Sequence, residues 1–499
     1  MANQGIFFRR RSALPLTAGL VAAQGIAFWF VGKSNLELQQ SMRAVQTAGW
    51  LPLPAGSAAD SLSTATAAFW GGLFYTLSVG AGLALATWAI LYLWQRLFSD
   101  RPKLLWGALA LWSVLLLAIN FRGWAFFPTL FGVAVPLAVF LGAVRTRPPS
   151  VAMPSRLWPV PLITLALLTG IWATQMNAQL FTTIRDYLLL SNPAGQAVND
   201  FYYRYTLHAA QTFKSFDQRT LRVARFASAD DAQANEPLIA TLARHDVVTI
   251  TQGAPVDMTL LSSGEHLVLV SNTNDRLTIT KAEFLSDPGP WLRRFSEMGD
   301  RHAPLRRLTF AGLLLGFPIL LFVLVDGLIG RLAGIFTHES AQIWLRAAFC
   351  LVIGIGLFIP ILIGRQPDVA RPALGAALDS GHWPERVAAL RLVARENIDL
   401  AAFPQYRSIL NSALVVERYY LARALAASRR PGTLPDLFAL IRDAHPNVVC
   451  QAFYALGKRR NRAAIVPIQA QVMTSDHWYV QWYGYRAMRS LGWHQRRSH

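Results

Sequence analysis

The sequence predicts a mainly α-helical, polytopic membrane protein with a small α+β segment outside the membrane and a C-terminal α-solenoid. Three observations support this fold class. Hydrophobic residues make up 53% of the 499 residues and charged residues only 15%, whereas a soluble globular domain carries about 25% charged residues. Seven apolar windows are long enough to be membrane spans. Beyond residue 365, small and apolar residues recur every 31 or 32 positions.

The seven windows predict transmembrane helices, because a hydrocarbon core about 30 Å thick needs about 20 apolar residues. They cover approximately 13–32, 66–95, 104–121, 124–144, 157–176, 308–330 and 342–364. Arg9, Arg10 and Arg11 precede the first window, as in a signal peptide. However, the apolar stretch continues through Phe28–Val31 without a small-residue cleavage site. We therefore expect an uncleaved anchor and about seven spans.

Lysine and arginine in the short loops predict the orientation, because cytoplasmic loops carry an excess of these residues. One set of loops contains three basic stretches, at residues 9–11, 96–103 and 145–156. The opposite loops contain three isolated cations, Lys33, Arg43 and Arg122. We expect a bacterial inner (cytoplasmic) membrane protein with a cytoplasmic N-terminus and both soluble segments in the periplasm. A miscount of one early helix would move both segments to the cytoplasm.

These assignments divide the chain into four parts: a membrane domain with five helices (1–176), an extramembrane α+β segment (177–307), a two-helix membrane hairpin (308–364) and a repeat domain (365–499). In the α+β segment, short runs rich in β-branched residues predict strands at 247–251, 258–261, 266–271 and 276–280. Helical spacing predicts helices at 180–190 and 197–213. The second contains an aromatic run, Phe201–Tyr205, which is typical of a membrane interface and alternatively provides a ligand platform.

Two charges fall within the predicted spans. Asp326 lies near the end of the sixth span and Arg346 near the start of the seventh, and the short connection 331–341 places them at similar depth. They predict either an interhelical ion pair that locks the hairpin or part of a proton or ion path. Gln24 and Asn120 are isolated polar residues with no partner visible in the sequence. No span is rich in acidic residues, which disfavours a proton-driven pump.

The C-terminal third has a regular period. Small or apolar residues recur in register at Ala389, Leu421, Ala452 and Gly484, and prolines recur at Pro404, Pro435 and Pro467. Each proline stands where a second helix would begin, a position that tolerates a missing N–H. We assign both sets to the repeat core. Each helical hairpin is too small to bury its apolar face alone, so the period predicts a stack of hairpins.

One stretch of the repeats is similar to a known class. His445–Val449, followed by Ala452–Gly457 and Ala464–Pro467, resembles a HEAT-type repeat, and most closely the short HEAT-like form named after phycobilisome lyases. The resemblance covers about 380–492. It departs from the family at Val449, where an arginine commonly follows the valine. The resemblance implies protein–protein binding; it identifies no substrate and implies no lyase activity.

Basic residues gather in equivalent inter-helix turns of the repeats. They are Arg429, Arg430, Lys458, Arg459, Arg460 and Arg462. A row of such turns predicts a basic edge, which could dock on anionic lipid headgroups or an acidic partner, or could simply keep the array soluble.

Three histidines, His382, His445 and His477, also fall in register. Equivalent positions of stacked helices lie about 10 Å apart, too far to share a zinc ion whose ligands lie within about 2.3 Å of the metal. We interpret these histidines as turn caps.

No familiar catalytic motif is present. The chain has no Walker A loop, no Rossmann glycine fingerprint, no His-Glu-x-x-His and no Cys-x-x-Cys-His. Two cysteines, Cys350 and Cys450, are too few for a disulfide framework. We expect no catalytic residue, no metal and no cofactor.

The leading hypothesis is a non-catalytic inner-membrane scaffold or complex-assembly subunit. Its expected partners are membrane lipid and other membrane or periplasmic proteins, but no nucleic acid; the oligomeric state is left open. One alternative is a transporter or channel component with Asp326 and Arg346 on its path. Another is a membrane enzyme acting on lipid or glycan.

Overall fold

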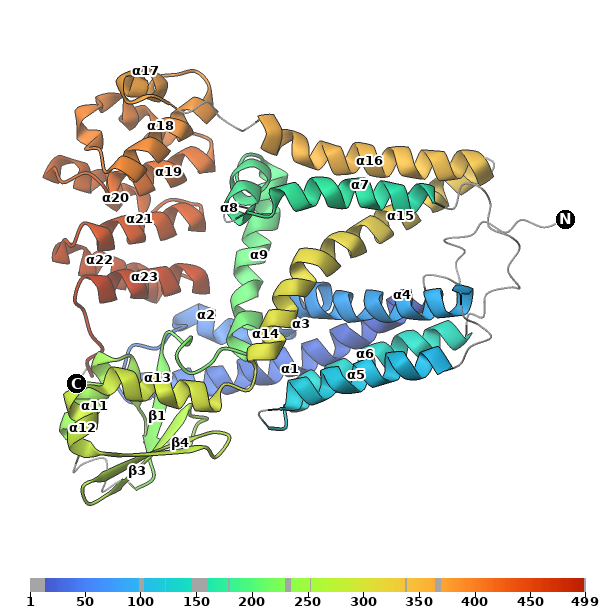
Figure 1. The fold of residues 1–499 in the computed structure, drawn as a ribbon. Coiled ribbons are helices and arrows are strands. Elements are labelled where there is room, and N and C mark those ends of the chain that lie inside the picture. The colour runs from blue at the N-terminus through green and yellow to red at the C-terminus, as the bar shows by residue number, and fades with distance from the viewer. Residues whose placement is uncertain are drawn as a thin grey trace. The chain divides into compact units, whose positions relative to one another are not determined.

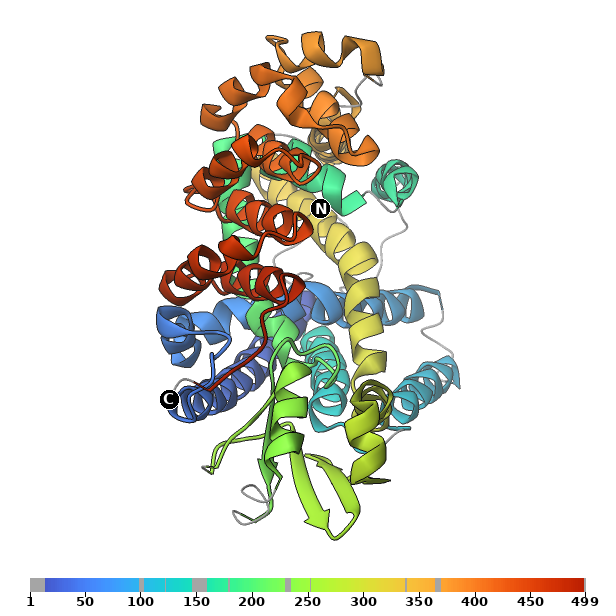
Figure 2. The same ribbon diagram turned by 90° about the vertical axis from the view of Figure 1, so that its left-hand side faces the viewer.

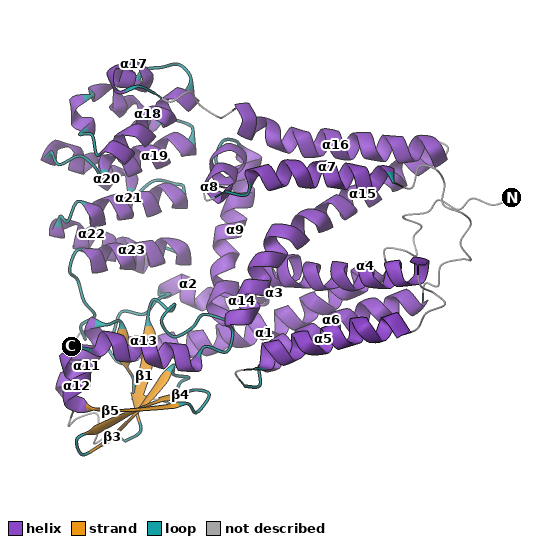
Figure 3. Ribbon diagram, in the orientation of Figure 1, coloured by secondary structure: helices purple, strands orange, loops and turns teal. Residues whose placement is uncertain are grey.

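The computed structural model describes residues 14–97, 103–121, 123–145, 159–177, 180–228, 235–251, 253–336, 339–363 and 369–497. The chain forms two compact units. The first contains residues 1–33, 65–180 and 301–359, and the second contains residues 34–64, 181–300 and 360–499. Figure 1 shows the elements coloured along the chain, and Figure 3 shows that helices predominate, with strands confined to one small sheet. The mainly α-helical class with a small sheet is confirmed.

The first unit consists of long apolar helices. They are α1 (Leu14–Thr47, as far as Lys33), α3 (Ala65–Tyr75), α4 (Ala81–Leu97), α5 (Lys103–Asn120), α6 (Phe126–Arg145), α7 (Val160–Gln175), α14 (Ala303–Ala311), α15 (Phe317–Phe336) and α16 (Glu339–Ile363). π-Helical turns at Thr76–Gly80 and Gly312–Gly316 join α3 to α4 and α14 to α15. Each of the seven predicted windows therefore coincides with helix.

Length and composition distinguish the helices that could cross a membrane. Among the described residues, five segments qualify: Leu14–Thr47, Ala65–Leu91, Phe126–Arg145, Ala303–Ile335 and Ala341–Ile361. α7 qualifies only together with Leu180–Leu189, which follows it after a break. The apolar part of α5, Trp106–Asn120, is shorter than the others. The total of seven spans remains a prediction.

Close helix packing in the first unit depends on small residues and local polar contacts. A Cβ at Gly312 would lie 2.5 Å from the carbonyl oxygen of Ser78, so the two π-helical turns can approach only because glycine stands there. Gln24 and Asn120, isolated in the sequence, both have partners. The Gln24 side chain accepts a hydrogen bond from Thr76 Oγ1 at 2.7 Å, and Asn120 Oδ1 accepts one from the backbone N–H of Ala125 at 2.8 Å.

A five-stranded mixed sheet forms one part of the second unit. The strands are β1 (Arg222–Phe226), β2 (Val247–Thr249), β3 (Met258–Ser263), β4 (His266–Ser271) and β5 (Arg276–Thr280), in the order β2-β1-β3-β4-β5. β1 is parallel to β2 and β3, and the pairs β3–β4 and β4–β5 are antiparallel. Helices α11 (Glu236–Arg244), α12 (Lys281–Ser286) and α13 (Pro288–Gly299) accompany the sheet. The strand β1, which pairs in parallel with both β2 and β3, is not among the predicted strands.

The repeat domain is a stack of helical hairpins. The first helices are α18 (Trp383–Glu396), α19 (Val415–Leu425), α21 (Pro446–Lys458) and α23 (Trp478–Ser490), and the second helices are the 3-10 helix Pro404–Asn411, α20 (Leu434–Leu440) and α22 (Ile465–Thr474). α17 (Leu374–Leu378) precedes the stack, and short 3-10 turns lie at 371–373, 400–402, 431–433 and 462–464. Successive first helices contact one another from α18 to α23, as the layers in Figure 2 show.

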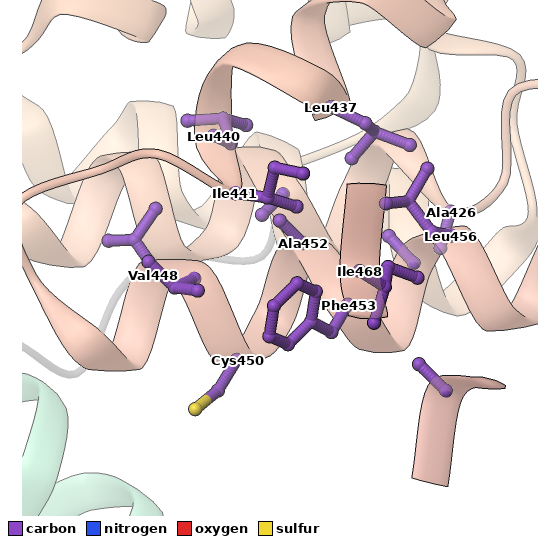
Figure 4. Close-up of a cluster of buried hydrophobic side chains, with 14 of the residues drawn as sticks. Ala426, Leu437, Leu440, Ile441, Val448, Cys450, Ala452, Phe453, Leu456 and Ile468 are labelled. Carbon is purple, nitrogen blue, oxygen red and sulfur yellow. The ribbon is translucent and has the colours of Figure 1, made fainter. Parts of the chain in front are cut away.

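The two sets of residues that we assign to the repeat core differ in their burial. Ala389, Leu421 and Ala452 are fully buried. Gly484 is buried too, and a Cβ there would lie 2.4 Å from a methyl group of Val472. Figure 4 shows how Phe453 and its apolar neighbours fill the space between the helices of two neighbouring repeats.

The prolines are not core residues. Pro404 and Pro435 are exposed and Pro467 is half-buried, which corrects their assignment. All three lie in the first turn of a second helix. There the helix has no internal acceptor for an N–H, so proline is tolerated because of backbone geometry rather than burial.

The second unit has one continuous core built from three separate parts of the chain. Residues 34–64 contribute Met42, Val45 and Trp50, and the sheet contributes Val223 and Val248, to the same buried cluster as the repeats. The short helix α2 (Gly56–Asp60) and a 3-10 turn, Ser61–Ser63, complete the first of these parts. The structure thus divides the chain differently from the four predicted domains. Residues 34–64 belong to the second unit rather than to the predicted 1–176 domain, and the α+β and repeat segments belong to that same unit.

Hydrogen bonds join the same three parts. Gln481 in α23 both accepts from the N–H of Ala55 and donates to its carbonyl oxygen, each at 2.9 Å. Trp50 Nε1 donates to the carbonyl oxygen of Thr249 in β2 at 2.9 Å. The last repeat is therefore capped by the chain's own residues.

Candidate interaction surface of the repeat array

The start of each first helix is fixed by a recurring contact. The backbone N–H two residues after a Ser or Asp donates to that side chain, at His382–Ser380 (3.1 Å), Leu414–Ser412 (3.1 Å), His445–Asp443 (2.8 Å) and His477–Ser475 (3.1 Å). The pattern has the period of the repeat, so each helix begins at the same point of its unit.

Arginines in the first turns join neighbouring repeats. Arg386 donates to the carbonyl oxygen of Ser380 and pairs with the buried Glu417 of the next repeat. Arg418, 32 residues later, donates through Nε to Asp443 at 2.6 Å. Val449 occupies the equivalent position in α21 and ends this series. The spacing of the two arginines equals the repeat period, and this signal in the sequence could have revealed them.

Two of the three histidines in register act as caps. The Nδ1 atoms of His445 and His477 accept from the N–H groups of Asn447 (3.3 Å) and Tyr479 (3.2 Å). The His382 side chain makes no capping bond. Within the described ranges, no group of three His, Cys, Asp or Glu side chains is arranged to hold a metal ion.

Part of the array is covered by the chain's own preceding segment. This segment contains α8 (Leu180–Ile184), a π-helical turn (Arg185–Leu189) and α9 (Pro193–Thr212). At its start, the fully buried Asp186 carboxylate accepts hydrogen bonds from Arg185 Nε at 2.9 Å and from Tyr420 Oη at 2.6 Å, and pairs with Arg391. Burial and then the Asp186 charge raise the pKa of Tyr420, so its hydroxyl stays protonated and donates.

α9 continues this coverage along α21 and α23 (Figure 1). Asn199 donates to the side-chain oxygen of Asn447 at 3.0 Å, and the rings of Tyr203 and Tyr479 lie 4.5 Å apart. The predicted aromatic run is therefore divided: Tyr203 packs on the array, whereas Phe201 and Tyr202 are exposed. A partner must use another part of the repeat surface.

The turns after the first helices are exposed and lie side by side. Arg430 Nε lies 3.1 Å from a carboxylate oxygen of Asp399, and Lys458 Nζ donates to Asn397 at 3.2 Å. Arg459 donates to Thr433 at 2.9 Å and to the carbonyl oxygen of Arg430 at 2.8 Å. These contacts join three successive turns into one row, which we call the basic edge.

The six predicted cations of the basic edge differ in role. Arg459 is half-buried and its guanidinium holds two turns together. The other five, Arg429, Arg430, Lys458, Arg460 and Arg462, are exposed. These cations lie in the turns that connect first helices to second helices.

In the first unit, the structure brings Asp326 and Arg346 together. Both are buried, Arg346 Nε donates to Asp326 Oδ1 at 2.9 Å, and a second guanidinium nitrogen contacts Oδ2. This two-point geometry neutralises both charges between α15 and α16.

Comparison with known families identifies the repeats. Residues 403–489 match the family model described as HEAT repeats, so this C-terminal stretch contains HEAT-type repeats, as predicted. Comparison with curated proteins gave no match, and comparison with solved structures gave none.

Two buried histidines, His208 in α9 and His477 at the start of α23, predict that the protein loses stability in acid. Burial, and then the neighbouring His477, lowers the pKa of His208 to about 4; burial lowers that of His477 to about 4 as well. In the unfolded chain these histidines have the ordinary pKa of about 6.5 and bind protons below it. In the folded chain they stay neutral until the pH approaches 4. Stability is therefore complete above pH 6.5 and falls towards pH 4, by up to about 3 kcal/mol per histidine.

Urea unfolding of the full chain at a series of pH values measures this dependence. His208→Phe keeps an aromatic ring that does not titrate, and His477→Asn keeps an acceptor for the capping hydrogen bond. The double variant should lose less of its free energy of unfolding between pH 6.5 and 4. His266→Asn, at an exposed site, is the matched control. An identical pH profile in the double variant would contradict the assignment.

The buried pair predicts that Asp326→Asn destabilises the first unit. The change leaves the Arg346 guanidinium buried without its counter-charge, which costs about 3 kcal/mol or more. Thermal unfolding and the yield of folded protein in detergent provide the measurement. Replacing both residues, as Asp326→Leu with Arg346→Met, should restore most of the stability. Normal stability of Asp326→Asn with loss of ion flux would instead favour a transport path.

Proposed function

We propose that this chain is a non-catalytic integral inner-membrane scaffold or complex-assembly subunit that binds partner proteins through its HEAT-type repeats. The observation that carries the proposal is the repeat surface itself: the helices are packed in register and tied by Arg386 and Arg418, and the basic edge remains exposed. A preformed surface loses little conformational entropy on binding, so more of its contact energy appears as affinity.

The shared core supports a single location for the second unit. Its three parts, 34–64, 181–300 and 360–499, are separated in sequence by apolar helices. One compact body lies on one side of a bilayer, so an even number of crossings must separate each part from the next. α15 and α16 supply two. Between 64 and 181, α3–α4 and α6 supply two, and α5 and α7 must cross together or not at all.

An odd number of crossings, five or seven, fits the proposal, whereas six would place parts of the second unit on opposite sides of the bilayer. In both cases the N-terminus and the second unit lie on opposite sides of the bilayer. The positive charges of the loops favour a cytoplasmic N-terminus, and the second unit is then periplasmic.

A path for ions receives less support. The Asp326 and Arg346 side chains are each occupied by the other, whereas a relay needs groups that can release a proton or coordinate an ion. The pair is better suited to holding α15 against α16.

Photo-crosslinking in cells tests the scaffold function. A photoreactive residue at Val466 on α22 or at Arg460 on the basic edge should capture a defined protein, whereas exposed Leu285 and Met298 beside the sheet serve as reference positions. Point positions are preferable to deletion of the repeats, because deletion would open the shared core. Capture from no repeat position above the reference level would refute the scaffold.

Cysteine labelling tests the common location. Single cysteines at exposed Ser57, Ser263 and Ala413 place one label in each part of the second unit. A maleimide that cannot cross the inner membrane should label all three in intact spheroplasts, while the unmodified chain, whose Cys350 and Cys450 are buried, reports the background. Labelling of one or two sites only would contradict the shared side, and labelling of none would place the unit in the cytoplasm.

A further inference from the structure

A left-handed residue ends three of the four first helices. Asn397 (φ 52°), Arg460 (φ 54°) and Gly492 (φ 85°) follow α18, α21 and α23 at intervals of 63 and 32 residues. Helices commonly end in this conformation, and glycine followed by asparagine suits it. An arginine there is strained, because its Cβ crowds the following carbonyl oxygen.

The strained residue lies on the basic edge. Arg460 is exposed, and within the described residues neither it nor Arg429 forms an ion pair. Among the described residues, no ion pair therefore compensates this strain. Strained residues of this kind cluster at functional sites.

Charge along the edge is unbalanced. Among the residues that the structure describes, Arg430 is the only one of its six cations that pairs with an acid, Asp399. Arg459 and Lys458 are used to hold the turns together. The remaining three, Arg429, Arg460 and Arg462, are exposed and lie on turns of two successive repeats.

We propose that the basic edge binds an extended acidic segment of a partner protein. This rests on the proposed scaffold function and names the chemistry of its partner. A guanidinium offers a planar pair of donors that matches a carboxylate. Because the cations follow one line of turns, they match a single extended chain better than the two-dimensional array of headgroups on a bilayer.

The repeat period predicts the spacing of the acids. Packed helices, and so their turns, lie about 10 Å apart, and an extended chain advances about 3.3 Å per residue. One carboxylate in every three residues would therefore meet successive turns of the edge.

Binding of a labelled peptide made of repeated Asp-Gly-Ser triplets to the full chain in detergent tests the proposal. Fluorescence anisotropy at about 20 mM salt keeps screening low. The peptide should bind, and an Asn-Gly-Ser peptide should not. Each exposed ion pair contributes a factor of about 1.4 to 5. Arg460→Gly should therefore weaken binding about threefold, and the triple change Arg429→Ser, Arg460→Gly and Arg462→Ser about thirtyfold.

The strain gives Arg460→Gly a second readout. Removing the Cβ should lower the unfolding equilibrium constant about threefold while affinity falls, so stability and binding move in opposite directions. Arg460→Lys keeps the charge and should bind nearly as well as the unchanged chain. Arg442→Ser, in a turn at the other end of the hairpins and also exposed, is the matched control and should change neither.

Three results would overturn the proposal. They are no difference between the acidic and neutral peptides, equal loss in the Arg442→Ser control, and binding to vesicles rich in phosphatidylglycerol that competes out the peptide. Crosslinks from Val466 but none from Arg460 would contradict binding at the basic edge and leave the proposed scaffold function intact. Absence of crosslinks from both positions would contradict both proposals.

Discussion

A helical hairpin of about thirty residues cannot bury its apolar face alone, and this constraint determines most of the second unit. Each first helix must pack on the next, from α18 to α23. The two ends of the stack then need covers. At the last repeat the cover comes from the sheet and from residues 34–64, whose Trp50 and Met42 enter the same core. The need to close the stack thus ties three distant parts of the chain together.

Closure has consequences for function. A shared core built from three separate parts of the chain restricts where the intervening apolar helices can begin and end. It also makes the repeats inseparable from their neighbours, unlike solenoids that end in free capping repeats. Coverage by α8 and α9 leaves the exposed turns and second helices as the surface open to other proteins.

Two buried carboxylates in this protein are paired with arginines. The Asp186 carboxylate has two arginines and a tyrosine, and Asp326 has Arg346. Such groups add less to stability than an apolar core would, but they fix which surfaces meet, because a displaced charge would be left without a partner. The same reasoning explains Arg386 and Arg418, which set the register between repeats. Arg460, by contrast, is exposed and its backbone is strained.

The sequence by itself determined the features that have a local period. Ala389, Leu421, Ala452 and Gly484 recur at the repeat length and are buried, and the prolines mark the starts of second helices, although they are exposed. Apolar length likewise predicted the long helices of the first unit. The tertiary structure alone decided the rest: the strand β1, the partners of Gln24 and Asn120, the place of residues 34–64 and the coverage by α9. Periodicity reports which face of an element is apolar, but it carries no information on which distant surface meets that face, and that pairing depends on shape and charge assembled from several parts of the chain.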